Sequence, residues 1–552
     1  MMINAISRGF VPFRILFCSL CAMAAVFVVS CDIGSRESDI SIDNNLGQAE
    51  IESKMLKLSL GPIRTLDPAF ATTRAEFAVI DRIFEPLVRI NDDGMPEPAA
   101  AEKWQILNSA STYIFTLREG LRWSDGYELT AFDFEFAWER SLHPDSGSLH
   151  AYLLFPIDGA SDYNEGTGND VQAVGIQALD KFRLKVELSE PSVGFLARTS
   201  LWNFVPVPKH LVENDPREWA SRGKIVSNGP MGITSWTDDH VKLSANIEYR
   251  STKDVSENEL LIELPNMDYL PLESFRSGGV DVLALDANLL ARVRSDSALM
   301  KNSAVLPGSG NWFLVFDVDR EPWSNVKVRQ AISLALDREE LVAHVFEGVE
   351  LPSKSLIPHN VLGESETSAF GPDVSAAQML LEEAGYPGGA GLPSIVLVTN
   401  DTPRWERLAV ELDSQLSAAL GIGIKIEQKK FREYIEFTQN PGDFHLYRAG
   451  WSSEYPDPAN WLSDIWDSET NFMSAGWVNH EYDKLVQSAM QEVDLSERWA
   501  KYRDAKKILD GELPAIPIAD RAVAFLVSER VTGVNISATG DYLLIDKVQL
   551  ES

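Results

Sequence analysis

Residues 447–461 bring together the side chains that are best suited to bind a charged ligand. The stretch reads YRAGWSSEYPDPANW and holds one arginine, two acids, two prolines, one glycine and four aromatic residues. Arginine can bind a carboxylate with two parallel hydrogen bonds, and a buried carboxylate needs a cationic partner. Arg448 and Glu454 therefore suit a ligand with both charges, such as a short peptide. Gly450 lets the backbone approach such a ligand, and the aromatic rings supply walls for its side chains.

The residues alone leave two other interpretations open. Arg448 could pair with an internal acid while the aromatic rings belong to the core. Glu454 and Asp457 could instead be the carboxylate pair of a glycoside hydrolase, flanked by tryptophans that stack on sugar rings. The prolines make that segment rigid, and nothing in the sequence sets the carboxylate separation. Motifs of phosphate-binding loops, serine hydrolases and zinc proteases are missing, so no catalytic residue, cofactor or metal site is predicted.

The first 54 residues read as an export and anchoring segment. Arg8 and Arg14 precede an apolar run over 15–29, and Val28-Val29-Ser30-Cys31 follows. This pattern predicts a signal peptide over 1–30, with Cys31 resembling the lipidated cysteine of bacterial lipoproteins. An ordinary signal peptide or an uncleaved anchor is the alternative. Residues 31–54 are polar and predict a flexible tether. All three cysteines lie within the first 31 residues, so no disulfide is expected.

Charge and length narrow the class of protein. The 552 residues carry 49 basic and 82 acidic side chains, a net charge of −33, which argues against nucleic-acid binding. The length suffices for about three domains. Residues 113–117, 182–188 and 241–247 alternate between apolar and polar side chains and predict strands. Later segments predict a helix over 326–345 capped by Ser324 or Asn325, a helix over 375–384, a β-α-β unit over 395–428, and a basic helix over 496–509 with a solvated face.

The stretch from Arg448 to Pro458 resembles the ligand loop of one transporter-associated family. This family is the peptide/opine/nickel class of ABC-transporter solute-binding proteins, family 5, and the oligopeptide-binding lipoproteins are the most similar members. The resemblance extends over nearly all of residues 55–550. The other segments that resemble family motifs are Thr65–Pro68, Phe84–Val88 with Asp93 and Gly94, Phe115–Gly120, Trp123–Gly126, Thr130 with Asp133, Pro206–Lys209, Ser227–Pro230 with Trp236, and Val328–Ile332 with Asp337 and Arg338.

The resemblance implies a mixed α/β (α+β) fold of the two-lobed periplasmic-binding-protein type, with an additional appended domain. The implied first lobe combines 55–84, 205–307 and 522–552, the appended domain covers 85–204, and the second lobe covers 308–521. The implied function is not enzymatic. It is capture of short peptides in an interdomain cleft and delivery to the permease and ATPase of an ABC importer. The implied receptor is a monomer, lipid-anchored to the outer face of the cytoplasmic membrane.

The resemblance also implies roles for individual residues. Glu454 matches an aspartate that holds the amino terminus of the peptide, and Arg448 matches an arginine that meets the carboxylate of shorter peptides. Trp451 and Phe431 match walls of the pocket, and Trp405 stands where a histidine contacts longer peptides. These replacements leave the class of ligand open to an oligosaccharide, an opine, a nickel chelate or a peptide signal. The expected ligand-binding residues are Glu454, Arg448, Trp451, Gly450, Tyr455, Phe431, Trp405 and Asp457.

Overall fold

The structure is a computed structural model that describes residues 55–551, apart from 93, 169, 252–258, 266–269, 364–370, 440, 442–443, 470 and 474. The predicted signal peptide over 1–30, Cys31 and the remainder of the predicted tether lie outside these residues. Among the described helices, none has both the length and the apolar character that a membrane crossing requires.

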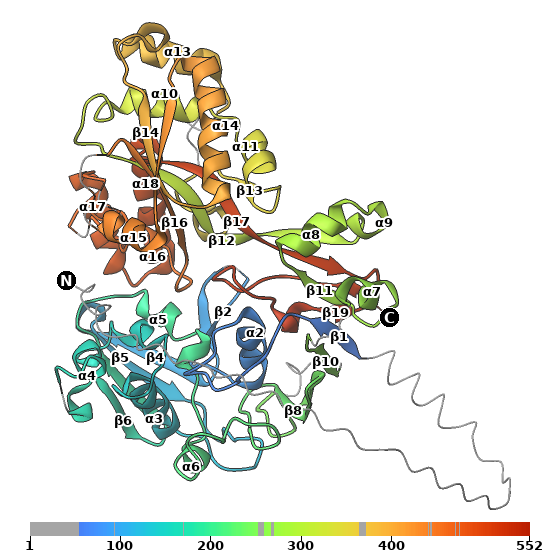
Figure 1. Cartoon of the computed structure of the whole chain (residues 1–552). Coiled ribbons are helices and arrows are strands. Elements are labelled where there is room, and N and C mark those ends of the chain that lie inside the picture. Colours follow the sequence, from blue (N-terminus) through green and yellow to red (C-terminus); the bar gives the residue numbers. More distant parts are fainter. Residues whose placement is uncertain are drawn as a thin grey trace, which may run out of the picture. The chain divides into compact units, whose positions relative to one another are not determined.

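One large mixed sheet runs through the described part of the chain (Figure 1). Its two longest strands, β12 and β17, pair antiparallel along most of their lengths, with register shifts at 307/311 and 312/313. Such irregularities bend a strand, so these strands connect the two ends of the sheet through a bend. The strand order is β15 (Ile424–Lys429), β14 (Ile395–Asn400), β16 (Leu446–Ser452), β12 (Ser303–Phe316), β17 (Ala515–Val527), β11 (Val282–Leu285), β1 (Leu56–Ser59), β10 (Leu260–Glu263), β9 (His240–Ala245) and β8 (Met231–Trp236), and β13 (Leu351–Pro352) pairs with β17.

Helices pack around the β14 end of this sheet, as Figure 1 shows. They are α10 (Val326–Leu334), α11 (Arg338–Val345), α13 (Val374–Glu383) and α14 (Pro403–Leu420). The predicted β-α-β unit is confirmed, because β14 and β15 pair in parallel and α14 connects them. The apolar face of α14, which includes Leu408, Leu412 and Leu416, is buried, as the spacing of its leucines requires.

The predicted single helix over 326–345 is wrong, because the chain forms α10 and α11 with a break between them. Asn325 caps α10, as one of the two expected residues, by accepting a hydrogen bond from the amide of Lys327. Asp337 caps α11 in the same manner. The buried guanidinium of Arg338 donates to the carbonyl of Pro517 at 2.7 Å, which ties the start of α11 to β17. The caps at Asn325 and Asp337 and the contact of Arg338 with Pro517 therefore divide the segment into two helices, although its apolar residues continue with helical spacing.

A separate antiparallel sheet has the order β4 (Ala101–Leu107), β5 (Thr112–Leu117), β7 (Arg183–Glu187) and β6 (Ile176–Asp180), with α3 (Ala131–Leu142) packed on it. Leu184 and Val186 are buried, whereas their strand neighbours Arg183, Lys185 and Glu187 are not. The three strands predicted from alternation, including β9 in the large sheet, are confirmed. The boundaries of the three predicted domains stay a prediction.

Further helices and strands complete the described part of the chain, and the basic helix near its end differs from its prediction. The remaining elements are α2 (Arg74–Ile83), β2 (Val88–Ile90), β3 (Pro96–Pro98), α4 (Ala160–Asn164), α5 (Phe195–Arg198), α6 (Lys209–Val212), α7 (Pro271–Arg276), α8 (Ala287–Arg294), α9 (Ser297–Met300), α12 (His359–Leu362), α15 (Phe431–Gln439), α16 (Ala459–Leu462), α17 (His480–Met490), α18 (Leu495–Glu512), β18 (Val531–Thr532) and β19 (Gln549–Leu550). On α18 the basic face was expected to be solvated. That expectation is wrong for Arg498 and Lys506, which are buried because α16 and α17 pack on the helix.

Candidate functional site

A cavity of about 360 Å³ lies against the bend in the large sheet. Its floor comes from three adjacent strands: Trp312 on β12, Gly450 and Ser452 on β16, and Arg521 on β17. Its walls come from the residues next to the β16 floor in the sequence and from segments far away along the chain. They are Phe77, His150, Tyr152, Leu153, Leu201, Trp202, Trp451, Ser453, Glu454, Thr539, Asp541 and Tyr542.

The floor is shaped by a tryptophan lying across a glycine. Trp312 and Gly450 are opposite each other in the pairing of β12 with β16. A Cβ atom at position 450 would overlap the indole of Trp312 and lie 2.9 Å from the carbonyl oxygen of Asn311. Glycine is therefore required for this close approach. The guanidinium of Arg521 lies 5.7 Å from a Trp312 ring and donates a hydrogen bond to Ser452 Oγ.

One asparagine orients the loop that carries Trp451 and Glu454. Asn460 Oδ1 accepts hydrogen bonds from Trp451 Nε1 at 3.1 Å and from the Glu454 amide at 2.9 Å. Its Nδ2 donates to Asp464 at 3.1 Å. Asn460 is fully buried, so it is part of a fixed frame. The side chains of Trp451 and Glu454 are thus both held at the edge of the cavity.

The carboxylate of Glu454 is partly buried and has neither a hydrogen bond nor an ion pair among the described residues. Burial raises the pKa of Glu454 above its ordinary value. The nearby charge of Arg198 lowers this pKa, and that of Asp464 raises it. Because desolvation disfavours the ionised carboxylate, a cationic group entering the cavity would stabilise it.

Aromatic rings form the opposite wall. Phe77, on α2, stacks on Trp202 with ring centroids 4.3 Å apart, and His150 meets Trp202 edge-on at 4.9 Å. Tyr542 meets Phe77 edge-on at 6.2 Å. Burial lowers the pKa of His150, which favours the neutral imidazole. The wall therefore presents apolar faces with few fixed hydrogen-bond demands, which suits varied side chains.

Arg448 lies beside the cavity and does not line it. Its guanidinium stands 4.7 Å from a Trp405 ring, 4.9 Å from Tyr434 and 5.5 Å from Trp312, and it donates to Asn400 Oδ1. Its Nε is buried without a hydrogen-bond partner, and burial lowers the pKa of Arg448. No acid among the described residues forms an ion pair with it. The alternative in which Arg448 pairs with an internal acid therefore lacks support in the described part of the chain.

Besides Arg448, four more predicted ligand residues do not line the cavity. Trp405 is buried and contacts Arg448. Asp457 forms a buried ion pair with Arg498 at 2.5 Å and accepts a hydrogen bond from the Ala459 amide at 2.9 Å.

The other two have different surroundings. Tyr455 donates to Asp464 at 3.0 Å, and Arg198 stands 3.5 Å from its ring. Phe431 is 63% exposed at the start of α15. Of the eight predicted residues, the cavity brings together Glu454, Gly450 and Trp451.

Sequence reasoning missed the cavity residues that come from other segments. Trp312 and Arg521 lie on β12 and β17, outside the stretch over 447–461 where the predicted site residues are concentrated. The aromatic wall is drawn from segments more than 450 residues apart in the chain, from Phe77 to Tyr542. Gly450 was a signal that a large group such as Trp312 packs there, because a glycine within a strand often marks a point where another group approaches the backbone closely.

A second buried carboxyl lies next to Arg521 on β17. Burial raises the pKa of Asp520 to about 7, which favours the protonated carboxyl. The neighbouring carboxylate of Glu350 contributes to this rise in pKa, whereas a hydrogen bond with Ser353 and the charge of Lys506 act in the opposite direction. One carboxyl oxygen, Oδ1, is buried without a partner.

Comparison with known proteins identifies the family. A profile described as bacterial extracellular solute-binding proteins, family 5 Middle, matches residues 95–473. The chain belongs to this family. Family 5 is a class of solute-binding proteins and not of enzymes, and the assignment confirms the resemblance found in the sequence.

Similar family 5 members span most of the chain. The dipeptide-binding protein DppE of Bacillus subtilis is 30% identical, with 85% of this chain and 87% of that protein covered. The oligopeptide-binding protein OppA of the same species is 29% identical, with 86% and 89% covered. The murein tripeptide-binding protein MppA in its unliganded open form has a TM-score of 0.80 at 25% identity, with 90% of this chain and 97% of that chain covered. This likeness confirms the predicted two-lobed α/β fold.

Proposed function

We propose that this protein is the extracytoplasmic receptor of an ABC importer, which captures short peptides in the cavity and delivers them to a permease driven by an ATPase. The observation that carries the proposal is the Glu454 carboxylate, which borders the cavity and forms no ion pair with a cation among the described residues. The α-ammonium group of a peptide would supply such a cation. Relatives that carry the names of oligopeptide-, dipeptide- and murein peptide-binding proteins support this choice.

The other end of a peptide would meet an arginine. The guanidinium of Arg521, on β17, lines the cavity. Arg448, on β16, lies beside the cavity, and its guanidinium contacts Trp312 from that side. We propose Arg521 as a first partner of the ligand carboxylate, and we keep Arg448 as a partner for ligands that displace the Trp312 indole. Peptide side chains would lie against the aromatic wall of Phe77 and Trp202.

The alternative ligands fit Glu454 less well. An uncharged oligosaccharide offers no cation to this carboxylate, so the cost of its burial would remain. An opine carries several carboxylates, which Glu454 and Asp541 in the same cavity would repel. Hydrolysis of a glycoside by Glu454 and Asp457 is not proposed, because Asp457 is already bound to Arg498.

The proposal extends to the cell envelope and to the domains. The signal peptide over 1–30 would export the protein, and a lipid on Cys31 would hold it at the outer face of the cytoplasmic membrane as a monomer. The basic start, the apolar run and the small residue before Cys31 support this location.

The two lobes and appended domain would have the boundaries predicted above. The course of β12 and β17 through the bend supports the junctions near 307 and 522.

The test is calorimetric titration with trialanine and with its N-acetylated form. The free peptide should bind, and acetylation should remove most of the affinity, because it removes the ammonium charge. Glu454→Gln should weaken trialanine by about 2–5 kcal/mol, the cost of stranding one partner of a buried charge pair. Glu213→Gln, a change at an exposed glutamate, is the matched control.

Two outcomes would count against the proposal. Equal binding of the free and acetylated peptides would show that Glu454 does not recognise the amino terminus. Native mass spectrometry of the purified protein gives an independent check, because a ladder of peptide masses is expected among co-purifying molecules. A single non-peptide mass would replace the proposed ligand and leave the fold unchanged.

A further inference from the structure

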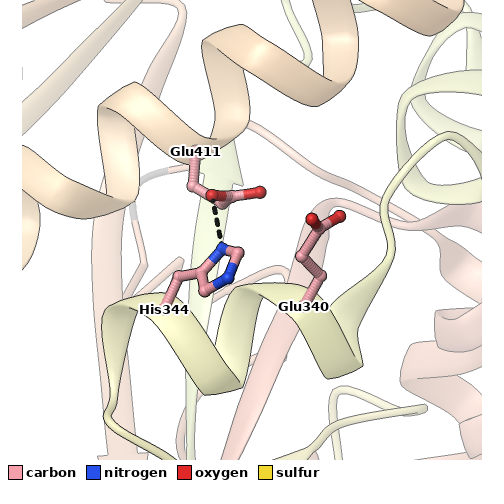
Figure 2. Close-up of side chains that lie close together, drawn as sticks. All are labelled: Glu340, His344 and Glu411. Carbon is pink, nitrogen blue, oxygen red and sulfur yellow. Dashed lines mark hydrogen bonds and ion pairs between the residues drawn. The ribbon is translucent and has the colours of Figure 1, made fainter.

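Two helices at the β14 end of the large sheet bring three metal-ligating side chains together. Glu340 and His344 lie on α11, and Glu411 lies on the facing helix α14 (Figure 2). One ligand atom from each side chain lies within 4.8 Å of the other two. None of these residues borders the cavity described above, so the cluster is separate from the proposed peptide site.

We infer that Glu340, His344 and Glu411 form a binding site for one divalent transition-metal ion, of which Zn²⁺ is the type. An imidazole nitrogen and carboxylate oxygens are ligands that zinc accepts at about 2.0–2.2 Å. Two donors of a tetrahedral zinc ion are therefore about 3.4 Å apart. His344 Nδ1 and Glu411 Oε2 are 3.0 Å apart, so this pair already has nearly the spacing that a shared metal requires.

The backbone and a neighbouring amide orient these ligands. Glu340 and His344 are four residues apart on α11 and so project from the same face. Gln415, one turn after Glu411 on α14, donates from Nε2 to Glu411 Oε1 at 2.9 Å and reaches Glu340 Oε2 at 3.5 Å. The same amide accepts from the backbone of Asp337 at 2.8 Å. Second-sphere hydrogen bonds of this kind orient the carboxylates of metal sites.

A helix-to-helix ion pair is the simpler explanation, and it accounts for only two of the three residues. His344 with Glu411 would suffice for such a pair, and His480 with Asp483 forms a comparable pair at 3.8 Å within the single helix α17. Glu340 adds a second carboxylate to the same point, and with a neutral imidazole the three side chains carry a charge of −2. That charge matches a dication. Water would complete the coordination, as in zinc sites with three protein ligands.

The test is calorimetric titration of the purified protein with Zn²⁺. The parent protein should bind one Zn²⁺ ion per chain. His344→Ala and Glu411→Gln should lose this ion, with affinity lowered more than tenfold, since even outer-sphere changes at metal sites cost about 10–100-fold. His480→Ala is the matched control, because it removes an exposed histidine beside an acid and should retain the ion. The variants do not differ at Cys18, Cys21 or Cys31, so any zinc bound by thiols cancels in the comparison.

A second measurement distinguishes a metal site from general surface binding. An ion bridging α11 and α14 stabilises only the folded state, so Zn²⁺ should raise the melting temperature of the parent protein and not that of His344→Ala. Mg²⁺ should have no such effect, because it rarely binds imidazole. Identical Zn²⁺ titrations of parent and His344→Ala, or equal losses in His344→Ala and His480→Ala, would overturn the inference.

Discussion

Glu454 and Asp457 are three residues apart in one loop, and the structure gives them opposite roles that one pair of substitutions can separate. Asp457→Asn removes the negative charge that faces Arg498 across 2.5 Å. Glu454→Gln removes a charge that has no partner among the described residues. We expect the first change to lower the stability of the fold and the second to lower affinity for peptides.

The magnitude for Asp457 follows from the burial of both partners. Their side chains are 5% and 3% exposed, so the Arg498 guanidinium left behind would keep its charge in a desolvated site. Breaking a buried ion pair in this way costs about 3–5 kcal/mol, whereas an exposed pair contributes about 0–1 kcal/mol. The pair Arg222–Asp238, with both side chains at least half exposed, is a suitable control through Asp238→Asn.

Guanidinium titration followed by tryptophan fluorescence measures the stability, and trialanine calorimetry measures the binding. Asp457→Asn should unfold at a clearly lower denaturant concentration than the parent protein, and Asp238→Asn should match the parent. At temperatures where Asp457→Asn remains folded, its peptide affinity should stay within about threefold of the parent value. Glu454→Gln should show the reverse pattern, because its carboxylate makes no contact that supports the fold.

One result would refute this reasoning directly. If Asp457→Asn lost peptide binding while its unfolding midpoint stayed unchanged, Asp457 would belong to the ligand site, as the sequence suggested. The ion pair with Arg498 would then not be a stabilising contact. Arg498→Met offers a further check, because it strands Asp457 and should destabilise the protein by a similar amount.

Two further substitutions test the floor of the cavity and its buried acid. Gly450→Ala should lower stability by about 1–3 kcal/mol and weaken peptide binding, because the new methyl group displaces the Trp312 indole. Guanidinium titration and calorimetry measure the two effects. Gly511→Ala, where a Cβ meets no neighbouring atom, is the control for both. Asp520 has a pKa of about 7 in the folded protein, above its ordinary value of 3.8. The contribution of its protonated carboxyl to the free energy of unfolding is therefore complete below about pH 4 and is lost as the pH rises through 7. Asp520→Asn stays neutral and should be more stable than the parent at pH 8 by up to about 4 kcal/mol, with no gain at pH 4. A gain that does not depend on pH would contradict the raised pKa.

Much of the fold was accessible from local patterns. Period-two alternation located β5, β7 and β9, and the order strand, helix, strand located the unit of β14, α14 and β15. These predictions succeeded because side-chain periodicity reports which face of an element is buried. The helix over 326–345 failed, since its break depends on Arg338 reaching Pro517, a contact between residues 179 positions apart.

The sequence by itself determined the family, the strands β5, β7 and β9, the unit of β14, α14 and β15, and the loop that carries Glu454, because these depend on local patterns of residues. Only the tertiary structure decided which of the loop's charges face a ligand. Arg498 neutralises Asp457, aromatic rings enclose Arg448, and the cavity receives Arg521 from a strand 67 residues after Glu454. The physical reason is that the state of a charge is set by its burial and by the partners that the fold brings to it. Those partners come from segments that no local pattern connects.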